Sequence, residues 1–592
     1  MSKSGTAEAE VFTFSITSEG SEIKGHYGLI AAEVTKEINK VGYAKLTFLD
    51  GDVMDGKFEI SEAKEFEPGK EIALKLGRNS KNTQVFKGIV INHNIKVING
   101  RGYLEIECYD KAIVLTARRN NKLFEKKKDS DIISELLGNA GVKKSVSGTD
   151  VKHEQLLQYG ATDWDFIVAR AEANGLVIIN EDGKVEVAKP DPTSGSALEL
   201  EFGTDIYDFD LGVSSYAQVP SVETIAWSIA KQKTEKVKSK NPKEVKQGDL
   251  KASKLAEVMG KEPYGMRSTT PLVKAELQSW ADGYANRAAL DKLKGEISFV
   301  GNADLKLNET LTIKGLGKRF NGDGYISGIK HEFSPGSWKT TCKLGLQNKY
   351  AAQTYDDLHA MPTGGLLPAV SGLLIGIVTK THEDPEGLNR VKVKLPTWDD
   401  SKEVWARIIS PYASKKVGIV FMPEVNDEVV IGFFNDDPRF PVIVGSLYSG
   451  KHEPPYPPDE KNKIKAIVTR EKMKIEFEEE KKIITIETPG KNTIIIDDDK
   501  KTITVQDQHK NKIETSKDGI LIDSAKDVNI KAKGNIVMDA KQKITIKAAM
   551  DYAVEGLTVK QKAKTQLALE GLTAEMKAST QAVVKGAIVM IN

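Results

Sequence analysis

The chain has 592 residues, of which 40% are apolar and 29% charged, and its formal net charge is +1. That length predicts about four domains. The balanced charge excludes a protein whose overall field draws in nucleic acid or an anionic membrane. The two cysteines, Cys108 and Cys342, are too few for a disulfide framework, which favours a reducing compartment and buried thiols.

Residues 1–10 are polar, and the sequence has no apolar run long enough to cross a bilayer. We therefore expect neither a secretory signal peptide nor a membrane span. The protein should begin in the cytoplasm, and a separate machine would have to export it.

Residues 11–180 are predicted to be mostly β, with two helices. β-Branched residues and turn signals indicate strands at 11–16, 44–49, 72–76, 85–91 and 103–108. Apolar spacing predicts helices at 130–137 and 163–174, followed by a hairpin at 176–187. The second helix should begin at Thr162, stop at Gly175 and bury a face made of Phe166, Ile167, Ala169 and Ala173.

Residues 228–265 form a Lys-rich insert, with ten lysines between Lys231 and Lys261. No aromatic residue is interleaved with the charge from 231 to 250, as a nucleic-acid site would require. We interpret the insert as a solvated arm that binds no nucleic acid. A helix at 276–294 and a hairpin joining 324–333 to 338–344 complete a β-rich region of two units over residues 1–350. The helix is expected to bury Leu277, Trp280, Ala281, Tyr284 and Ala288.

Residues 351–371 are predicted to be a linker, and residues 372–450 a small barrel of the OB type. About five short strands fit this length, the fourth beginning at Gly418. Basic residues such as Arg390 and Arg407 are balanced by acidic ones such as Glu403 and Asp427, which indicates a structural joint. Residues 451–460 contain four prolines and should form a stiff junction.

Residues 461–592 are dominated by a short repeat. Apolar residues occur in pairs at i and i+2, which places both on one face of a strand. The pairs recur every eight residues from 519 to 547, and every eight to ten residues upstream. A period this short has no room for a helix, so a β-helix or β-prism is expected. The residues that we assign to its core are Ile520, Ile522, Val528, Ile530, Ile536, Met538, Ile544 and Ile546.

A single chain of this kind would form a thin, poorly filled tube. Three chains around one axis would bring their apolar pairs together in one dry seam, and closed symmetric oligomers are common. We therefore predict an intertwined homotrimer over 461–592. The alternatives are a single-chain β-solenoid and a trimeric adhesin stalk, which would normally carry a signal peptide and a receptor-binding head.

Motifs for catalysis or cofactor binding are missing from the sequence, including the P-loop, the nucleophile elbow and HExxH. Adjacent His and Glu residues occur at 153, 331, 382 and 452. Neighbouring residues on a strand point to opposite faces, so these pairs make poor metal sites. We expect no cofactor, no metal and no enzymatic activity.

The sequence resembles a known family in several places. Segments 86–90, 106–110, 159–166 and 171–175 resemble the first half of phage baseplate hub proteins, also called the late-control or VgrG family, and 324–344 resembles their closing hairpin. Residues 372–450 resemble the spike OB domain of contractile tails. They depart from it at Asn389 and Asn426, where Gly is more usual, but Asn also tolerates left-handed backbone, so the turns should survive.

The resemblance implies a mainly β protein that is the structural spike, a VgrG-like hub and needle, of a contractile injection apparatus. A phage tail, a type VI secretion system and an extracellular phage-like particle all stay open. The trimeric hub would dock on the inner tube and baseplate, effector cargo would be a further partner, and sheath contraction would drive the needle through a membrane. A PAAR-repeat protein caps the needle in this family, which predicts contacts at Ile588, Met590, Ile591 and Asn592. Some hubs carry a cell-wall hydrolase, so a hydrolytic hub is the alternative.

Overall fold

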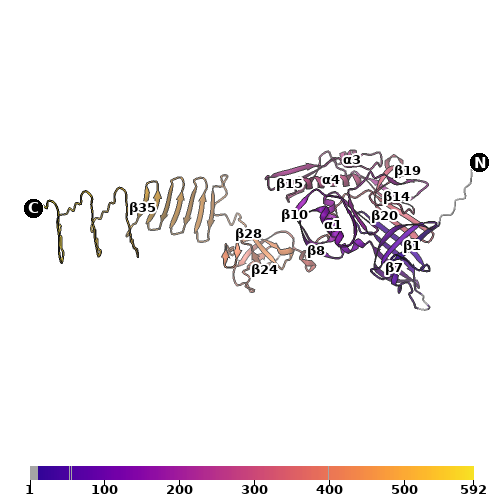
Figure 1. Ribbon diagram of the computed structural model, residues 1–592, viewed down its shortest axis with the longest axis horizontal. Coiled ribbons are helices and arrows are strands. Elements are labelled where there is room, and N and C mark those ends of the chain that lie inside the picture. Colours follow the sequence, from indigo (N-terminus) through magenta and orange to yellow (C-terminus); the bar gives the residue numbers. More distant parts are fainter. Residues whose placement is uncertain (1–10, 52–53, 55, 398, 592) are drawn as a thin grey trace, which may run out of the picture. The chain divides into compact units, whose positions relative to one another are not determined.

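The computed structural model describes residues 11–51, 54, 56–397 and 399–591 (Figure 1). The chain forms two compact units, the first ending at Leu447 and the second beginning at Tyr448. The protein is mainly β, as expected. Among the described residues, no helix is both long and apolar enough to cross a membrane.

The first unit is built on a large sheet. Its described strands lie in the order β14-β18-β21-β20-β3-β4-β7-β6-β5-β1-β2, and β19 and β13 branch from β20. The strands of the first half are β1 (Phe12–Ser18), β2 (Ser21–Glu22), β3 (Leu29–Glu37), β4 (Tyr43–Leu49), β5 (Glu71–Arg78), β6 (Lys81–Ile98) and β7 (Arg101–Tyr109). Those of the second half are β13 (Ser196–Glu201), β14 (Ile206–Val213), β18 (Leu293–Val300), β19 (Thr310–Lys314), β20 (Gly322–Ser334) and β21 (Ser337–Leu344).

Strand β20 belongs to both halves, because it pairs with β3 on one side and with β21 and β19 in the second half. Each half has its own apolar core. Leu46, Phe48 and Leu104 lie in the first, and Ile297 and Tyr325 lie in the second. Both cysteines are buried and free, and burial raises the pKa of each thiol to about 12.

A segment that contains both helices and strands lies between the two halves in the sequence. Its elements are β8 (Arg119–Lys128), α1 (Asp129–Asn139), β9 (Lys143–Val146), β10 (Lys152–Thr162), α2 (Asp163–Ala173), β11 (Val177–Glu181) and β12 (Lys184–Ala188). The predicted ends of α2 are confirmed, because Thr162 caps it with an Oγ1 that accepts from Asp165 N at 3.0 Å and Gly175 has φ +67°.

The predicted buried face of α2 is partly wrong. Ala169 is exposed, whereas Trp164, Val168 and Ala171 are buried together with Ile167. Positions 164, 167, 168 and 171 follow the spacing of one helical stripe, and Trp164 removes far more apolar surface from water than an alanine does.

The Lys-rich insert is not a solvated arm. It contributes to a three-stranded sheet in the order β16-β15-β17, covered on one face by a helix. Val237, Leu255 and Ala256 of the insert are buried, and Val237 packs in one core with Leu277 of the later helix. The elements are β15 (Val222–Ser228), β16 (Lys233–Lys238), α3 (Ala252–Met259), β17 (Tyr264–Ser268) and α4 (Lys274–Leu290). Helix α4 buries Leu277, Ala281 and Ala288 and half-buries Trp280 and Tyr284, the residues predicted for it.

A closed barrel follows the short helices α5 (Gly317–Phe320) and α6 (Ala351–Thr354). Its described strands are β22 (Leu374–Lys380), β23 (Val391–Leu395), β24 (Asp399–Ile408), β27 (Glu428–Phe433) and β28 (Pro441–Ser446), in the order β22-β23-β24-β28-β27. Val378, Val393, Ile431 and Ile443 are buried inside it. Asn389 and Asn426 have φ +57° and +76°, so the expected left-handed turns are confirmed.

The expected fourth strand from Gly418 is wrong. Two short strands, β25 (Ala413–Ser414) and β26 (Val417–Gly418), form a small hairpin outside the barrel. The apolar run behind them lies in an exposed loop, with Val420 80% and Phe421 65% exposed. Pro423 lacks an amide hydrogen for a ladder, and the barrel resumes at β27.

The second unit begins with a regular antiparallel sheet. Its described strands are β29 (Ile464–Val468), β30 (Lys474–Glu478), β31 (Ile483–Glu487), β32 (Thr493–Asp497), β33 (Thr502–Gln506), β34 (Lys512–Ser516) and β35 (Gly519–Asp523), each paired with the next. From 524 to 591 the described chain bends repeatedly without an assigned strand, as the yellow end of Figure 1 shows. The strands from 464 to 523 pair within one chain. The winding of three chains around one another, which we expected over all of 461–592, is not tested by a single chain and stays a prediction.

Candidate functional site: an apolar assembly face on the second unit

One face of the β29–β35 sheet carries two continuous columns of apolar side chains. Ile475 lies opposite Ile486, which lies opposite Ile494, and Ile494 lies opposite Val505. In the second column, Phe477 lies opposite Ile484, and Ile484 opposite Ile496. We call this surface the apolar face; its residues are Ile475, Phe477, Ile484, Ile486, Ile494, Ile496, Ile503, Val505, Ile513, Ile520 and Ile522.

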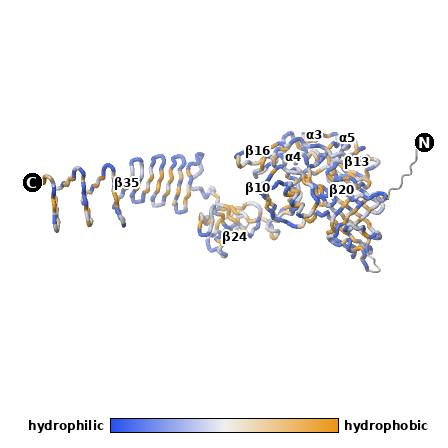
Figure 2. The backbone as a smooth tube through the Cα atoms, viewed as in Figure 1, coloured by the Kyte–Doolittle hydropathy of each residue, from blue (hydrophilic) through white to orange (hydrophobic). Residues whose placement is uncertain are grey.

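In a single chain, this sheet exposes apolar side chains on one face and buries a carboxylate on the other. Ile494 and Ile496 of β32 are 41% and 39% exposed, whereas Asp497 on the opposite face is 4% exposed. Figure 2 shows hydrophobic residues along these strands and hydrophilic turns between them. A water-soluble protein does not normally expose a contiguous apolar surface of this kind unless another molecule covers it.

The opposite face satisfies its own charges. Lys474 Nζ lies 3.0 Å from Glu476 and 3.1 Å from Glu487, and the hydrogen bond to Glu476 raises the pKa of Lys474. Asp497 accepts from Lys500 N at 2.9 Å, which lowers the pKa of the carboxyl. This face therefore has polar partners within the chain, and the apolar face is the one left to be covered.

The turns on one edge of the sheet repeat every 19 residues. Thr488 N donates to Asn492 O, and Asp507 N donates to Asn511 O in the same way. The side-chain oxygen of Asn492 accepts from Gln508 N at 3.2 Å, and that of Asn511 accepts from Ala525 N at 3.0 Å. Each asparagine thus links one turn to the next. We did not identify these residues from the sequence, although their equal spacing was visible in it.

The predicted core residues of the distal repeat are exposed in a single chain; Ile520 and Ile522 belong to β35 and pair with β34, and the other six lie beyond the last assigned strand. Ile520, Ile522, Val528, Ile530, Ile536, Met538, Ile544 and Ile546 are between 52% and 75% exposed. In the described residues, bends recur at 525, 533, 541 and 549, the eight-residue step of the sequence. The predicted tip residues Ile588, Met590 and Ile591 are more than 80% exposed, and Asn592 lies outside the described residues.

A groove of about 570 Å³ runs along the apolar face where the sheet passes into the distal repeat. Its apolar lining comes from Ile486, Ile494, Val505, Ile513, Ile522 and Val528. The groove is therefore continuous with the columns described above, and it has room for apolar side chains of another chain.

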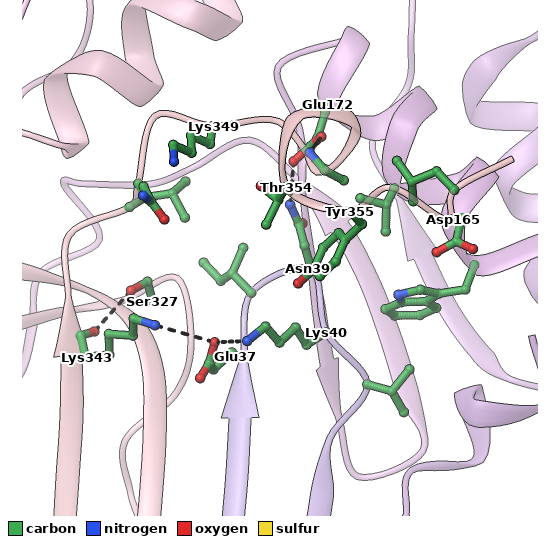
Figure 3. A pocket seen from close by; sticks show the side chains of 18 of the residues that line it. Glu37, Asn39, Lys40, Asp165, Glu172, Ser327, Lys343, Lys349, Thr354 and Tyr355 are labelled. Carbon is green, nitrogen blue, oxygen red and sulfur yellow. Dashed lines mark hydrogen bonds and ion pairs between the residues drawn. The ribbon is translucent and has the colours of Figure 1, made fainter. Parts of the chain in front are cut away.

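The first unit contains a cavity of about 960 Å³, lined by the end of β3, by α2 and by residues 343–358 (Figure 3). Its charges pair with one another. Glu37 lies 2.7 Å from Lys40 and 3.7 Å from Lys343. Burial alone would raise the pKa of Glu37, but these two lysines outweigh it and the pKa is lowered. Glu172 forms an ion pair with Arg287 at 2.8 Å. The ion pairs that line the cavity, such as that between Glu37 and Lys343, therefore join the two halves of the unit.

A second polar cluster surrounds Asp129 at the start of α1. The carboxylate accepts from Arg170 at 2.7 and 2.9 Å and from Asn174 at 2.9 Å, and His153 Nε2 lies 3.0 Å away. Burial would raise the pKa of Asp129, but the Arg170 hydrogen bonds outweigh it and lower the pKa. The cluster joins α1, β10 and α2, which is a structural arrangement.

The His and Glu residues considered as metal ligands are dispersed. His331 is buried and contacts Thr340 Oγ1 at 2.9 Å, and burial lowers its pKa to about 3. His382 is exposed, 4.0 Å from Glu383. Within the described residues, no group of three His, Cys, Asp or Glu side chains is placed to hold a metal ion.

Comparison with protein families gives two matches. Residues 8–335 match the Alg8 N-terminal domain, and residues 374–448 match the type VI secretion system/phage-baseplate injector OB domain. The second match coincides with the closed barrel.

Two curated proteins of Vibrio cholerae are similar to this chain. The actin cross-linking toxin VgrG1 is 23% identical over 68% of the chain and 38% of its own length. The type VI secretion system spike protein VgrG3 is 24% identical over 59% of the chain and 36% of its own length. The chain thus spans less than two fifths of either relative. Among solved structures, the E. coli c3393 protein, a component of the type VI secretion system, has a TM-score of 0.37 at 13% identity, covering 73% of this chain and 99% of that one.

Proposed function

The chain belongs to the Alg8 N-terminal domain family and carries the injector OB domain of type VI secretion systems and phage baseplates, and from this premise we propose that it is the trimeric hub and needle of a contractile injection apparatus. The first unit and its barrel form the hub and joint, and the second unit forms the needle. The protein is structural: the sheath supplies the work, and the needle supplies a stiff, narrow rod.

The observation that carries the proposal is the open apolar face. Each buried Ile side chain stabilises an assembly by roughly 1.5–3 kcal/mol. The eleven residues on the apolar face and six more in the distal repeat are already about half buried in one chain, so they would gain about half of this on assembly, on the order of 20 kcal/mol per chain before entropy is subtracted. A lone chain gains none of this, whereas three chains facing one axis gain most of it.

Three copies also satisfy the backbone of the distal repeat. In the described residues from 524 to 591, the chain has regular bends but no strand ladder of its own. Backbone amides and carbonyls that enter a dry interior need partners, and parallel passes of two further chains would supply them. The rod that results has no lateral sheet edge.

Partners follow from the two ends of this trimer. The hub docks on the inner tube and the baseplate, and effector cargo is carried on the assembled spike. The exposed apolar tip at Ile588, Met590 and Ile591 takes a PAAR-repeat cap. The protein is made in the cytoplasm and leaves on contraction.

The proposed role is not enzymatic. Only residues 447–463 separate the last barrel strand from the first needle strand, so a hydrolase domain has no room between them. The name of the Vibrio toxin relative refers to that protein, of which this chain spans less than two fifths.

The decisive experiment is sedimentation of the full purified chain, whose protomer mass is 65.0 kDa. We expect a single species of three protomers that binds a co-encoded PAAR protein and the inner tube protein. A stable, folded monomer at micromolar concentration would contradict the proposal. Deletion of the gene should leave sheaths that contract without injecting.

A further inference from the structure

The edge of the large sheet at β14 is acidic and aromatic. Among the described strands β14 pairs only with β18, so its other edge is open. Tyr207 is 60% exposed, and the exposed Phe209 packs edge-on against Phe202 with ring centroids 5.7 Å apart. Residues 190–213 contain six carboxylates and no Lys or Arg. Those of Asp208 and Asp210 are exposed.

The outer face of the three-stranded β16-β15-β17 sheet is basic. Its inner face is buried against α4 by Val222, Ala226 and Met266. On the outer face, Ile225 lies between Lys236 on β16 and Arg267 on β17, and both cations are exposed. Trp227 is also exposed on this face. We call this surface the basic face.

The charges of both surfaces are only partly compensated: Glu199 pairs with Lys314, and Glu223 lies on the basic face opposite Lys238. Among the described residues, Lys238 and Arg267 form no ion pair, and Lys236 reaches Glu223 only at 3.7 Å. Asp208 and Asp210 likewise have no ion-pair partner in the described part of the chain. Within the first unit, β14 and β15 lie well apart (Figure 1), so one copy does not bring its acidic edge onto its own basic face.

We propose that in the trimer the acidic edge of each copy, at β14, lies against the basic face of the next copy. The inference rests on the proposed function, because it assumes three copies around one axis. Two different and complementary patches on one protomer make a head-to-tail contact, which closes into a ring when the rotation is 120°. Exposed aromatic residues on both patches supply apolar contact, and the opposite charges select the register.

Charge complementarity favours a second copy over the two other readings of the basic face. Lysines on an edge strand can simply prevent aggregation, but that role does not require Arg267 on the far side of the sheet or an exposed Trp227. An RNA or DNA partner would leave the acidic edge unexplained. A second copy accounts for both surfaces at once.

The test uses engineered disulfides in the full chain. Cys108 and Cys342 are fully buried, so new surface thiols are the reactive ones. The double variant Asp208→Cys/Lys236→Cys should form a covalent ring of three under mild oxidation, visible without reductant on a denaturing gel. Neither single variant should form it, and a mixture of the two single variants should give covalent dimers.

Charge reversal then tests the electrostatic part. In the double-cysteine background, Lys238→Glu should slow crosslinking roughly 5-fold or more at low salt, and adding Asp210→Lys should restore it. The matched control is Lys254→Glu, which changes the net charge equally at an exposed site on α3 and should leave the rate unchanged.

The outcomes separate this inference from the proposed function. A chain that sediments as a trimer but does not crosslink overturns the interface and leaves the needle intact. Crosslinking that ignores the reversal at Lys238 overturns the charge pairing. A chain that sediments as a monomer overturns both proposals.

Discussion

A single substitution on β32 tests the central argument, because its neighbour provides a matched control. Ile494 lies on the apolar face between Ile486 and Val505, whereas Ile495 lies on the opposite face between Thr485 and Thr504. The two residues have the same side chain, strand and backbone environment. Changing each to Asp therefore isolates the effect of the face.

In the trimer, Ile494→Asp removes a buried isoleucine at a cost of about 2–5 kcal/mol per chain. An unpartnered carboxylate in an apolar interior costs several kcal/mol more. Threefold symmetry places three such carboxylates at one level, so the assembly loses on the order of 15 kcal/mol. In a lone chain Ile494 is 41% exposed, and either substitution would cost about 1 kcal/mol.

Sedimentation velocity and thermal melting of both variants measure this difference. We expect Ile495→Asp to remain a trimer with nearly the original melting temperature and Ile494→Asp to dissociate or aggregate. Equal behaviour of the two variants would refute the trimeric interior, whatever their absolute stability.

Three further predictions concern the first unit. Asn426→Val should destabilise the barrel by about 1–2 kcal/mol, since a β-branched residue strains at φ +76°, whereas Asn426→Gly should be neutral; hydrogen exchange of β27 measures both. His331 has a folded pKa of about 3, so the unfolded state binds more protons between pH 3 and 6.5. Stability should therefore fall on acidification by up to roughly 1.4 kcal/mol per pH unit, and His331→Asn should remove that slope in urea unfolding. The pKa of Asp129 is lower in the folded state than in the unfolded state, so this carboxylate stabilises the fold at pH values above its unfolded pKa, and the stabilisation is lost as pH falls through the folded pKa. Asp129→Asn should cost about 3 kcal/mol of unfolding free energy at pH 7 and should make stability less dependent on pH in the acid range.

Local features of the fold could be predicted because single residues determine them. The cap at Thr162, the stop at Gly175 and the left-handed turns at Asn389 and Asn426 depend on backbone preferences that the residue type carries with it. The alternation of Ile494 and Ile496 likewise determined which face of the strand is apolar, since the side-chain period of a strand is two.

Features that depend on distant partners were not predictable in this way. Val237 is isolated among lysines, and it packs in one core with Leu277 of α4, which begins at Lys274. The exposed run at 419–422 has the composition of a core strand, but the barrel is already closed by β27 and β28. In both cases the local pattern was ambiguous, and tertiary packing decided the outcome.

The change of period along the second unit explains why its two parts behave differently. Up to β35, turns at 469, 488 and 507 recur every 19 residues, which is enough for two strands and two turns. The chain can then pair each strand with the next and satisfy its own backbone. After Asp523 the repeat shortens to eight residues, which is one short strand and one bend. Such a repeat has no second strand that could fold back and pair with the first. We therefore propose that its ladder partners come from other chains, so that the proximal sheet can form in a single copy and the distal repeat becomes stable when three copies meet.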